Sequence, residues 1–374
     1  MKVVLLLPTY NERESITTLL ELLRSAVVSV RNHTIKYLVI DDNSPDGTAH
    51  EVRAYQKNHK DVYLITGKKE GLGKALLRGM EYATETLDAD IIGQMDGDLS
   101  HDPAVLPRFI AAIDNGYDFA IGSRYIPGGS IPSNWGPHRK LFSIFGNAIV
   151  RYGLGFSHVH DWTGGYRVYK KQYYESMRNK LESYRGYVFQ IAFLHKSIAH
   201  GARIFEVPII FTDRRFGKSK IAPSEYIRDV LLYVIRERWH SIRTGSFGKF
   251  CVVGTVGFII NTVVLEWMVR EGFHPTIGSI VGAELAIVSN FTLNNIWTFR
   301  DRLIVGMRLL EKFIQFNMTS VGAIVIQAGT IAIGTFLFGI PTYRFFYIAG
   351  VGFGLIWNYF MYSRVIWKKT PFKT

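Results

Sequence analysis

The fold is decided by the stretch SIRTGSFGKFCVVGTVGFIINTVVLEWMVR (residues 241–270), within which the character of the chain changes. Before it, short apolar runs alternate with turns of Gly, Asp and Asn, which is the pattern of a soluble α/β domain. Beyond it come long, nearly uncharged stretches that suit the hydrocarbon of a membrane. In a chain of 374 residues we therefore expect an α/β domain over 1–223, an amphipathic interfacial helix or linker over 224–245, and a membrane domain of two helical hairpins over 246–374.

Four apolar stretches in the C-terminal part are each long enough to cross a bilayer, which takes about 20 helical residues. They cover residues 250–269, 277–296, 313–338 and 345–366. Buried core helices have a similar composition, but the flanking charges favour membrane spans. Arg and Lys cluster before the first stretch, between the second and third, and after the fourth, whereas the other two connections carry only Arg270 and Arg344. Because basic loops stay in the cytoplasm, the sequence predicts an integral membrane protein with four transmembrane helices and a cytoplasmic N-terminal domain and C-terminus.

The net charge of +13 could indicate binding to nucleic acid. In the C-terminal part, however, Arg and Lys stand at the ends of apolar stretches, so we expect a membrane and no nucleic acid as the partner.

The only cysteine, Cys251, leaves no disulfide within the chain and favours a reducing compartment. The N-terminal MKVVLLLPTY is too short for a signal sequence and reads as a first strand. For Glu284, inside the second apolar stretch, a buried hydrogen bond is favoured over a proton or lipid path.

Polar clusters follow the predicted strands of the N-terminal part. Continuous β-favouring runs over 3–7, 37–40 and 91–94 predict parallel strands of a doubly wound sheet, whose ligands bind outside the carboxyl ends of the strands. Carboxylates gather at those ends, and a divalent cation that carries a diphosphate would offset their repulsion. We therefore expect Asp96 and Asp98 of the sequence DGD to handle Mg²⁺ or Mn²⁺. DAD at 88–90 precedes its strand and reads as a solvated turn.

Seven motifs occur in an order and spacing that resemble those of the dolichyl-phosphate mannose synthases, which are inverting family 2 glycosyltransferases with a GT-A fold. These motifs are PTYNE (8–12), DDNSPDGT (41–48), GLGKA (71–75), MDGDLSHDP (95–103), GSRY (122–125), DWTGGYRVY (161–169) and RRFGKSK (214–220). The resemblance covers about residues 1–240, and GLG and LSH are more similar to the mannose enzymes than to their glucose-transferring relatives. The membrane part resembles the GtrA-like four-helix domain that is fused to such enzymes in some microbes.

The resemblance implies transfer of mannose from GDP-mannose to dolichyl or another polyprenyl phosphate. It implies catalytic roles for Asp98, Arg124, Arg214 and Lys220 and metal binding by Asp96, Asp98 and Ser100. The residues implied to bind the nucleotide sugar are Pro8, Tyr10, Glu12, Ile40, Asp42, Asp96, Gly97, Asp98, Ser100, Arg124, Arg139, Arg214 and Lys220. Those implied to bind the acceptor phosphate are Ser123, Arg124, Arg139 and Asp161, where Asp161 could instead orient an arginine.

The chemistry of such an acceptor explains the need for many cations. A lipid phosphate is already anionic at neutral pH, so its attack on the anomeric carbon needs no strong general base. Two anions must meet, however, which calls for arginine, lysine and a metal ion arranged around the phosphates. The segment RRFGKSK has this composition, and Gly217 within it favours a loop that closes over the donor. Amphipathic segments over 138–154 and 224–243 predict that the site rests on the membrane surface.

Three other functions are considered. The nearest is a polyprenyl-phosphate glucosyltransferase that uses UDP-glucose, and the sequence separates the two donors only through the resemblance. A lipid-linked sugar flippase or transporter is an alternative of another class, supported by Glu284 and the repeated hairpins. A processive polysaccharide synthase is disfavoured, because the nearest match to its QxxRW helix has Ile235 in place of Gln. A homo-oligomer remains open.

Overall fold

The computed structural model describes residues 1–184, 186–213 and 223–368. The chain divides into two compact units, Met1–Arg238 and Trp239–Thr374, and helix α9 (Pro223–Thr244) contributes to both. Each unit is described by itself. The predicted boundaries at 223/224 and 245/246 differ from the division between the units and stay predictions.

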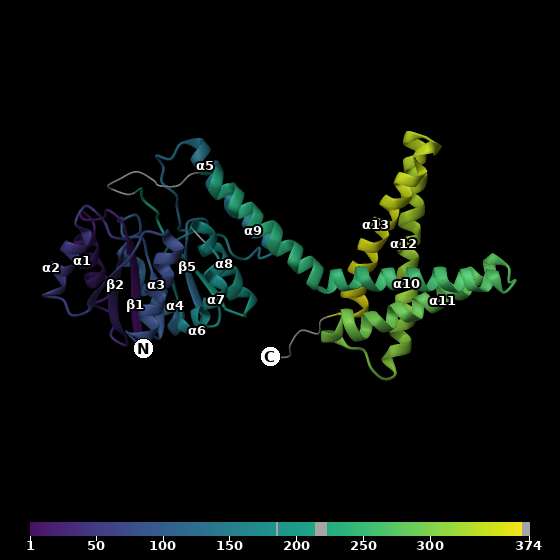
Figure 1. Cartoon of the computed structure of the whole chain (residues 1–374), viewed down its shortest axis with the longest axis horizontal. Helices are drawn as coiled ribbons and strands as arrows, with labels where there is room; N and C mark the ends of the chain where they lie inside the picture. Colours follow the sequence, from purple (N-terminus) through teal and green to yellow (C-terminus); the bar gives the residue numbers. More distant parts are fainter. Residues whose placement is uncertain (185, 214–222, 369–374) are drawn as a thin grey trace. The chain divides into compact units, whose positions relative to one another are not determined.

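The first unit is built on a seven-stranded sheet (Figure 1). The strand order is β3-β2-β1-β4-β6-β5-β7, and only the pairings of β6 with β4 and β5 are antiparallel. The strands are β1 (Lys2–Thr9), β2 (Thr34–Asp41), β3 (Val62–Thr66), β4 (Ile91–Gln94), β5 (Phe119–Ser123), β6 (Arg167–Lys170) and β7 (Ile204–Pro208). The predicted α/β architecture with a mostly parallel sheet is therefore confirmed.

Helices cover both faces of this sheet and bury its apolar side chains in two cores. One core contains side chains of α3 (Leu72–Glu85), α8 (Gly186–Ala199) and α9, such as Met80 and Phe193. The other contains side chains of α1 (Ile16–Ala26) and α4 (Leu106–Asp114), such as Leu20 and Phe109. The remaining helices are α2 (Thr48–Gln56), α5 (Pro137–Leu154), α6 (Lys171–Glu175) and α7 (Arg178–Leu181), with a short 3₁₀ turn at Pro103–Val105. Strands buried on both faces explain the continuous apolar runs of β1, β2 and β4.

The second unit consists of two helical hairpins. Helix α10 (Ser246–Arg270) packs on α11 (Pro275–Leu293), and α12 (Arg308–Phe338) packs on α13 (Tyr343–Met361). Each hairpin continues into a π-helical turn, Asn294–Thr298 or Tyr362–Ile366, and 3₁₀ turns lie at Arg300–Arg302 and Ile340–Thr342. An aromatic cluster that includes Phe250, Phe299 and Trp367 joins the hairpins.

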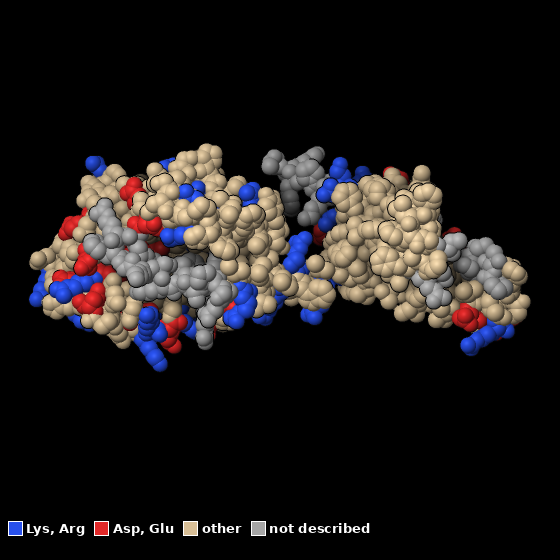
Figure 2. Space-filling model, turned by 90° about the horizontal axis from the view of Figure 1, so that it is seen from above, with Lys and Arg blue, Asp and Glu red and all other residues tan. Residues whose placement is uncertain are grey.

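Few charged residues lie on the second unit. On the face seen in Figure 2 it is mostly covered by residues that are neither acidic nor basic. Large apolar side chains on its helices are exposed, for example Phe258 and Phe336. Within the part of the chain that the structure describes, α10 is the one helix that is both long and apolar enough to cross a membrane. The predicted helices are thus present, while their number of membrane crossings stays a prediction.

Candidate active site

The carboxyl ends of β1, β2 and β4 lie at one edge of the sheet. In these parallel pairings, Thr9 of β1 lies opposite Asp41 of β2, and Leu6 of β1 lies opposite Gln94 of β4. The fully buried carboxylate of Asp41 accepts hydrogen bonds from the Thr9 hydroxyl at 3.2 Å and from the Ser44 hydroxyl at 2.5 Å. These bonds fix the loop after β2 against the loop after β1, so the first two predicted motifs meet.

Asp42, the predicted partner of the nucleoside base, is held by an arginine from α3. The Arg78 guanidinium lies 2.6 Å from the Asp42 carboxylate. Burial raises the pKa of Asp42, and the hydrogen bond and charge of Arg78 oppose this rise. Near this pair, the ammonium group of Lys69 lies 3.5 Å from the centre of the Tyr10 ring. The Ile40 side chain is fully buried in the core, so a contact with a ligand would have to use its backbone.

The DGD sequence after β4 packs tightly against the first motif. A Cβ atom on Gly97 would lie 3.0 Å from the Thr9 methyl group and 3.2 Å from the Pro8 carbonyl oxygen. The Ser15 hydroxyl bridges the Gly97 carbonyl oxygen and the Glu12 carboxylate, each at 3.0 Å. A larger residue between the two aspartates would require these neighbours to shift by a few tenths of an ångström, so glycine allows the close approach of DGD to the end of β1.

Two side chains that follow DGD are buried among polar and aromatic groups. The Asp98 carboxylate accepts the backbone N–H of Ser100 at 3.1 Å. Neither the Ser100 hydroxyl nor the His101 imidazole has a hydrogen-bond partner within the described ranges. His101 Nε2 nevertheless lies 3.4 Å from Asp96 Oδ2, and the ring lies between Tyr166 and Phe211. Buried polar groups normally have partners, so this cluster has the character of a ligand site.

The fit of this cluster to a divalent cation can be judged from its donors. Carboxylate and hydroxyl oxygens of Asp96, Asp98 and Ser100 are the ligand types that Mg²⁺ and Mn²⁺ prefer. Across residues 1–184, 186–213 and 223–368, no group of three or more His, Cys, Asp or Glu side chains is placed to hold a metal. The oxygen donors of Asp96 and Asp98, with the buried hydroxyl of Ser100, fit an ion that takes one or two protein carboxylates and completes its shell with diphosphate oxygens and water.

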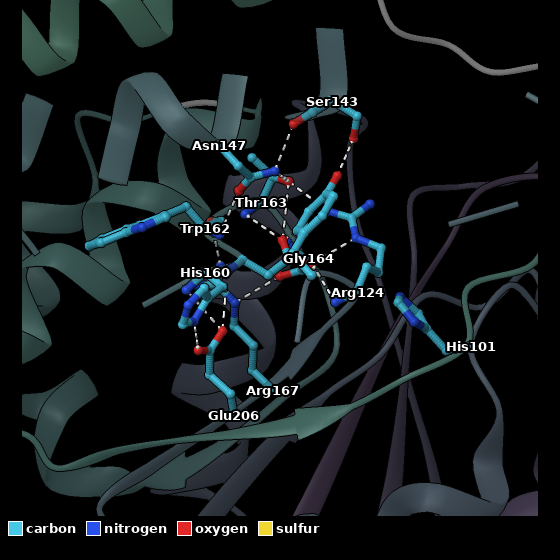
Figure 3. Close-up of polar contacts among 12 residues, drawn as sticks. His101, Arg124, Ser143, Asn147, His160, Trp162, Thr163, Gly164, Arg167 and Glu206 are labelled. Atoms are coloured by element: carbon cyan, nitrogen blue, oxygen red, sulfur yellow. Dashed lines mark hydrogen bonds and ion pairs between the residues drawn. The ribbon is translucent and has the colours of Figure 1, made fainter. Parts of the chain in front are cut away.

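Arg124 follows β5, and its partner Asp161 lies in the loop between α5 and β6. Figure 3 shows Arg124 beside Thr163 and Gly164 of this loop. A Cβ atom on Gly165 of this loop would lie 3.0 Å from Asp96 Oδ1. Arg124 donates from Nε to Asp161 Oδ2 at 2.7 Å and from Nη2 to Oδ1 at 2.9 Å. Burial acts to raise the pKa of Asp161, but the charge and hydrogen bonds of Arg124 outweigh it, and the pKa lies below its ordinary value. Asp161 therefore orients this arginine, one of the two roles considered for it.

Arg167 supports the same loop from within the core. Its side chain is fully buried and donates to the carbonyl oxygens of Gly164 at 2.8 Å, Trp162 at 2.9 Å and Gln190 at 2.6 Å. Burial lowers the pKa of Arg167 to about 10, so the group stays protonated at neutral pH. The sequence analysis assigned no role to Arg167 or His101. The signal for Arg167 was a charged residue directly before the apolar Val168 and Tyr169, and for His101 it was its place three residues after Asp98.

Of the other predicted phosphate-binding residues, Arg139 and Ser123 lie within the described part of the chain. Arg139, at the start of α5, stacks on the Trp135 ring at 3.9 Å and lies 3.3 Å from the Asp213 carboxylate. Ser123, the last residue of β5, is fully buried, and its hydroxyl has no hydrogen-bond partner among the residues described. The predicted residues Arg214 and Lys220, with their neighbours Arg215, Gly217 and Lys218, lie outside the described residues.

Sequence comparisons agree with this geometry. Residues 4–178 match the model of glycosyl transferase family 2, and residues 249–367 match that of the GtrA/DPMS transmembrane domain. A dolichol-phosphate mannosyltransferase from Pyrococcus furiosus is 31% identical over 332 residues, which are 87% of this chain and 89% of the relative. The chain belongs to the dolichol-phosphate mannosyltransferase family. It is therefore a glycosyltransferase and a membrane protein.

Two further relatives match about two thirds of this chain. A polyprenol monophosphomannose synthase from Mycolicibacterium smegmatis is 37% identical over 62% of this chain and 85% of its own length. An undecaprenyl-phosphate mannosyltransferase from Micrococcus luteus is 35% identical over 65% of this chain and 98% of its own length.

Proposed function

We propose that this protein is a membrane-bound inverting glycosyltransferase that moves mannose from GDP-mannose to dolichyl or another polyprenyl phosphate. The observation that carries the proposal is the close approach of Asp96 to the loop between α5 and β6, which holds Asp161, the partner of Arg124; a Cβ atom on Gly165 of this loop would lie 3.0 Å from Asp96 Oδ1. It brings carboxylates suited to a metal and an arginine suited to a phosphate to one edge of the sheet. The names of three relatives supply the mannosyl group and the polyprenyl phosphate.

In this proposal the donor nucleotide occupies the ends of β1 and β2. Pro8, Tyr10, Glu12, Asp42 and the backbone of Ile40 contact the nucleoside. Asp42 accepts hydrogen bonds from the base, and its ion pair with Arg78 holds it in the ionised form that can accept them.

The diphosphate occupies the DGD end of the site with a divalent cation. Asp96, Asp98 and Ser100 hold Mg²⁺ or Mn²⁺, which when bound neutralises charge on the leaving diphosphate. Gly97 allows the backbone to approach the diphosphate. His101 fixes the orientation of Asp96. Its Nε2 lies 3.4 Å from the Asp96 carboxylate, and its ring is held by contacts with the rings of Tyr166 and Phe211.

The acceptor phosphate attacks the anomeric carbon of mannose and displaces the diphosphate. Its own charge makes it a nucleophile, so the protein's task is to bring two anions together. Ser123, Arg124 and Arg139 bind the acceptor phosphate, with Asp161 as the positioning residue of Arg124. Arg214 and Lys220 complete the binding of both phosphates, and Asp98, Arg124, Arg214 and Lys220 together form the catalytic set.

The acceptor reaches the site from the membrane. On α5, Phe142, Phe145 and Tyr152 are exposed, and on α9 so are Ile235 and Trp239. Exposed aromatic and aliphatic side chains beside Arg and Lys are typical of helices that lie in the headgroup layer. We propose further that α10 to α13 form four spans with the catalytic unit and the C-terminus in the cytoplasm, which the distribution of basic residues supports. The match to a transmembrane family supports a membrane location for these helices.

The test is a donor screen with the full-length protein in detergent. Radiolabelled GDP-mannose or UDP-glucose is mixed with polyprenyl phosphate and Mg²⁺ or Mn²⁺, and lipid-linked label is measured after solvent extraction. We expect label from GDP-mannose only, and a loss of about 100-fold or more in Asp98→Asn, the size expected when a preorganised electrostatic group is removed. Asp88→Asn, in the exposed turn before β4, is the matched control and should keep full activity. Label from UDP-glucose alone would replace the proposal by the glucosyltransferase.

A further inference from the structure

The second unit contains a cavity of about 330 Å³ between its two hairpins. Its wall is largely apolar but includes three carboxamides. The residues that matter here are Phe250, Phe316 and Leu355 on the apolar side and Asn290, Asn294 and Asn358 on the polar side. No Arg or Lys is among the described residues that line it.

The three asparagines have unmet hydrogen-bonding capacity. Their side-chain oxygens are buried, and none has a partner in the part of the chain that the structure describes. Asn294 is only 1% exposed. Its neighbour Asn295 shows the contrast, because its oxygen accepts from the Ile304 N–H at 2.9 Å and from the Trp367 indole at 3.0 Å. An unpartnered buried amide is unfavourable, so three of them around one cavity indicate an occupant that donates hydrogen bonds.

The cavity lies at the junction of a repeat. Asn358 follows Asn290 by the same number of residues as the second π-helical turn, Tyr362–Ile366, follows the first, Asn294–Thr298. The rings of Phe299 and Trp367, which follow these turns directly, stack with their centres 4.7 Å apart. In membrane proteins, ligands commonly bind where two structural repeats meet and where helices depart from regular geometry.

We propose that this cavity binds the sugar headgroup of a lipid-linked sugar. Amide oxygens accept hydrogen bonds from hydroxyl groups but repel phosphate oxygens, and the described lining residues include no Arg or Lys that would balance the charge of a phosphate. The volume corresponds to about eleven water molecules of roughly 30 Å³ each, enough for one hexose ring. The apolar wall suits the C–H face of the ring and the start of a lipid chain. The inference rests on the proposed function, because a lipid-linked mannose is its product.

The test uses photocrosslinking, which reports where the sugar lies. The full-length protein in nanodiscs is irradiated with mannosyl phosphoryl citronellol that carries a diazirine on the sugar, and crosslinked peptides are mapped by mass spectrometry. We expect crosslinks in the peptides around Asn294 and Asn358. Gly254 lines the cavity, and a Cβ atom there would meet no other atom within 4 Å, so Gly254→Leu is the substitution chosen to reduce the space in the cavity. It should reduce these crosslinks by about tenfold or more, as displacement of a bound group does.

Two control variants and two competitors complete the design. Gly352→Leu also meets no atom within 4 Å but does not line the cavity, so it should keep the crosslinks. Asn294→Ala should lose them with an unchanged elution profile. Excess citronellyl phosphate or methyl mannoside should compete poorly. Equal competition by either one, or crosslinks that survive Gly254→Leu, would overturn the inference.

The readout is independent of the transfer reaction. Gly254→Leu should still transfer mannose to citronellyl phosphate at the rate of the unsubstituted protein. Lost crosslinks with intact transfer support the cavity. Absence of transfer in the unsubstituted protein with mapped crosslinks would instead reject the proposed reaction and keep the site.

Discussion

The ion pair of Arg124 with Asp161 gives the sharpest test of how the site is held together. In this pair the carboxylate is fully buried and the arginine side chain is 9% exposed. Asp161→Asn keeps the shape of the side chain but removes its charge, and the new amide group faces N–H donors of Arg124 and Gly164. Removing one partner of a buried pair costs about 3–5 kcal/mol. For a unit of this size, each kcal/mol lowers Tm by about 2–4 °C, so we expect a drop of about 6–20 °C.

The assay is thermal unfolding of the full-length protein in detergent, followed by intrinsic fluorescence. Asp88→Asn breaks the exposed pair with Lys2 and is the matched control, for which we expect no measurable change. The double variant Arg124→Gln/Asp161→Asn leaves no unpaired charge. Its loss should be smaller than the sum of the two single losses by about 1–3 kcal/mol. Additive losses, or a Tm within about 3 °C of the parent for Asp161→Asn, would refute the reasoning.

The pH dependence of the same variant gives a check on the cause. The folded-state pKa of Asp161 lies below its ordinary value, so its contribution to stability is present above the unfolded-state pKa of about 3.9 and is lost as the pH falls through the folded-state value. The difference in Tm between the parent and Asp161→Asn should therefore be full at pH 7 and shrink on acidification below about pH 4. A difference that is independent of pH would point to lost packing instead of lost charge.

Three further predictions concern the metal, the membrane unit and the phosphate site. Asp98→Asn should weaken Mn²⁺ binding in the presence of GDP by about tenfold or more, measured by electron paramagnetic resonance, and unchanged affinity would contradict the metal assignment. Asn295→Leu should lower Tm, because it leaves the Ile304 N–H and the Trp367 indole N–H without an acceptor, and each unpaired buried donor costs about 1–3 kcal/mol. Asn294→Leu should leave Tm unchanged or raise it. Asp213→Asn should strengthen GDP binding by up to about fivefold in titration calorimetry, because it frees Arg139, and weaker binding would contradict this.

The sheet could be predicted because its strands are buried on both faces. Their continuous apolar runs, each ended by polar residues, fix both the strands and the edge at which the polar residues collect. The sequence therefore predicted that the ends of β1, β2 and β4 would meet, and the Ser15 bridge between Glu12 and Gly97 shows that contact in the structure. The helices of the membrane part could also be predicted from the sequence, since apolar stretches of about 20 residues are typical of helices that cross a membrane.

The partners of charged side chains could not be predicted, because they depend on contacts between distant segments. Arg124 and Asp161 come from different motifs, and nothing in either motif says that they share a buried fork. The bonds of Arg167 to three carbonyl oxygens depend on how a loop folds back over a strand. The sequence also could not predict which asparagines lack hydrogen-bond partners. Asn294 and Asn295 are neighbours in sequence, and only their surroundings in the fold distinguish them.

The three ion pairs around the site differ in how readily they can exchange a carboxylate for a phosphate. Arg124 is locked by the buried Asp161, so a phosphate can be added to this pair but cannot replace Asp161 without the cost of an unpaired buried charge. Arg78 is held by Asp42 in a similar way. Arg139 is half exposed, and its pair with Asp213 contributes only about 0–1 kcal/mol. A site with fixed and exchangeable arginines can keep its shape without substrate and still gain new ion pairs when two phosphates arrive. Catalysis between two anions requires both properties, because a preorganised positive charge lowers the barrier only if a carboxylate of the protein does not already neutralise it.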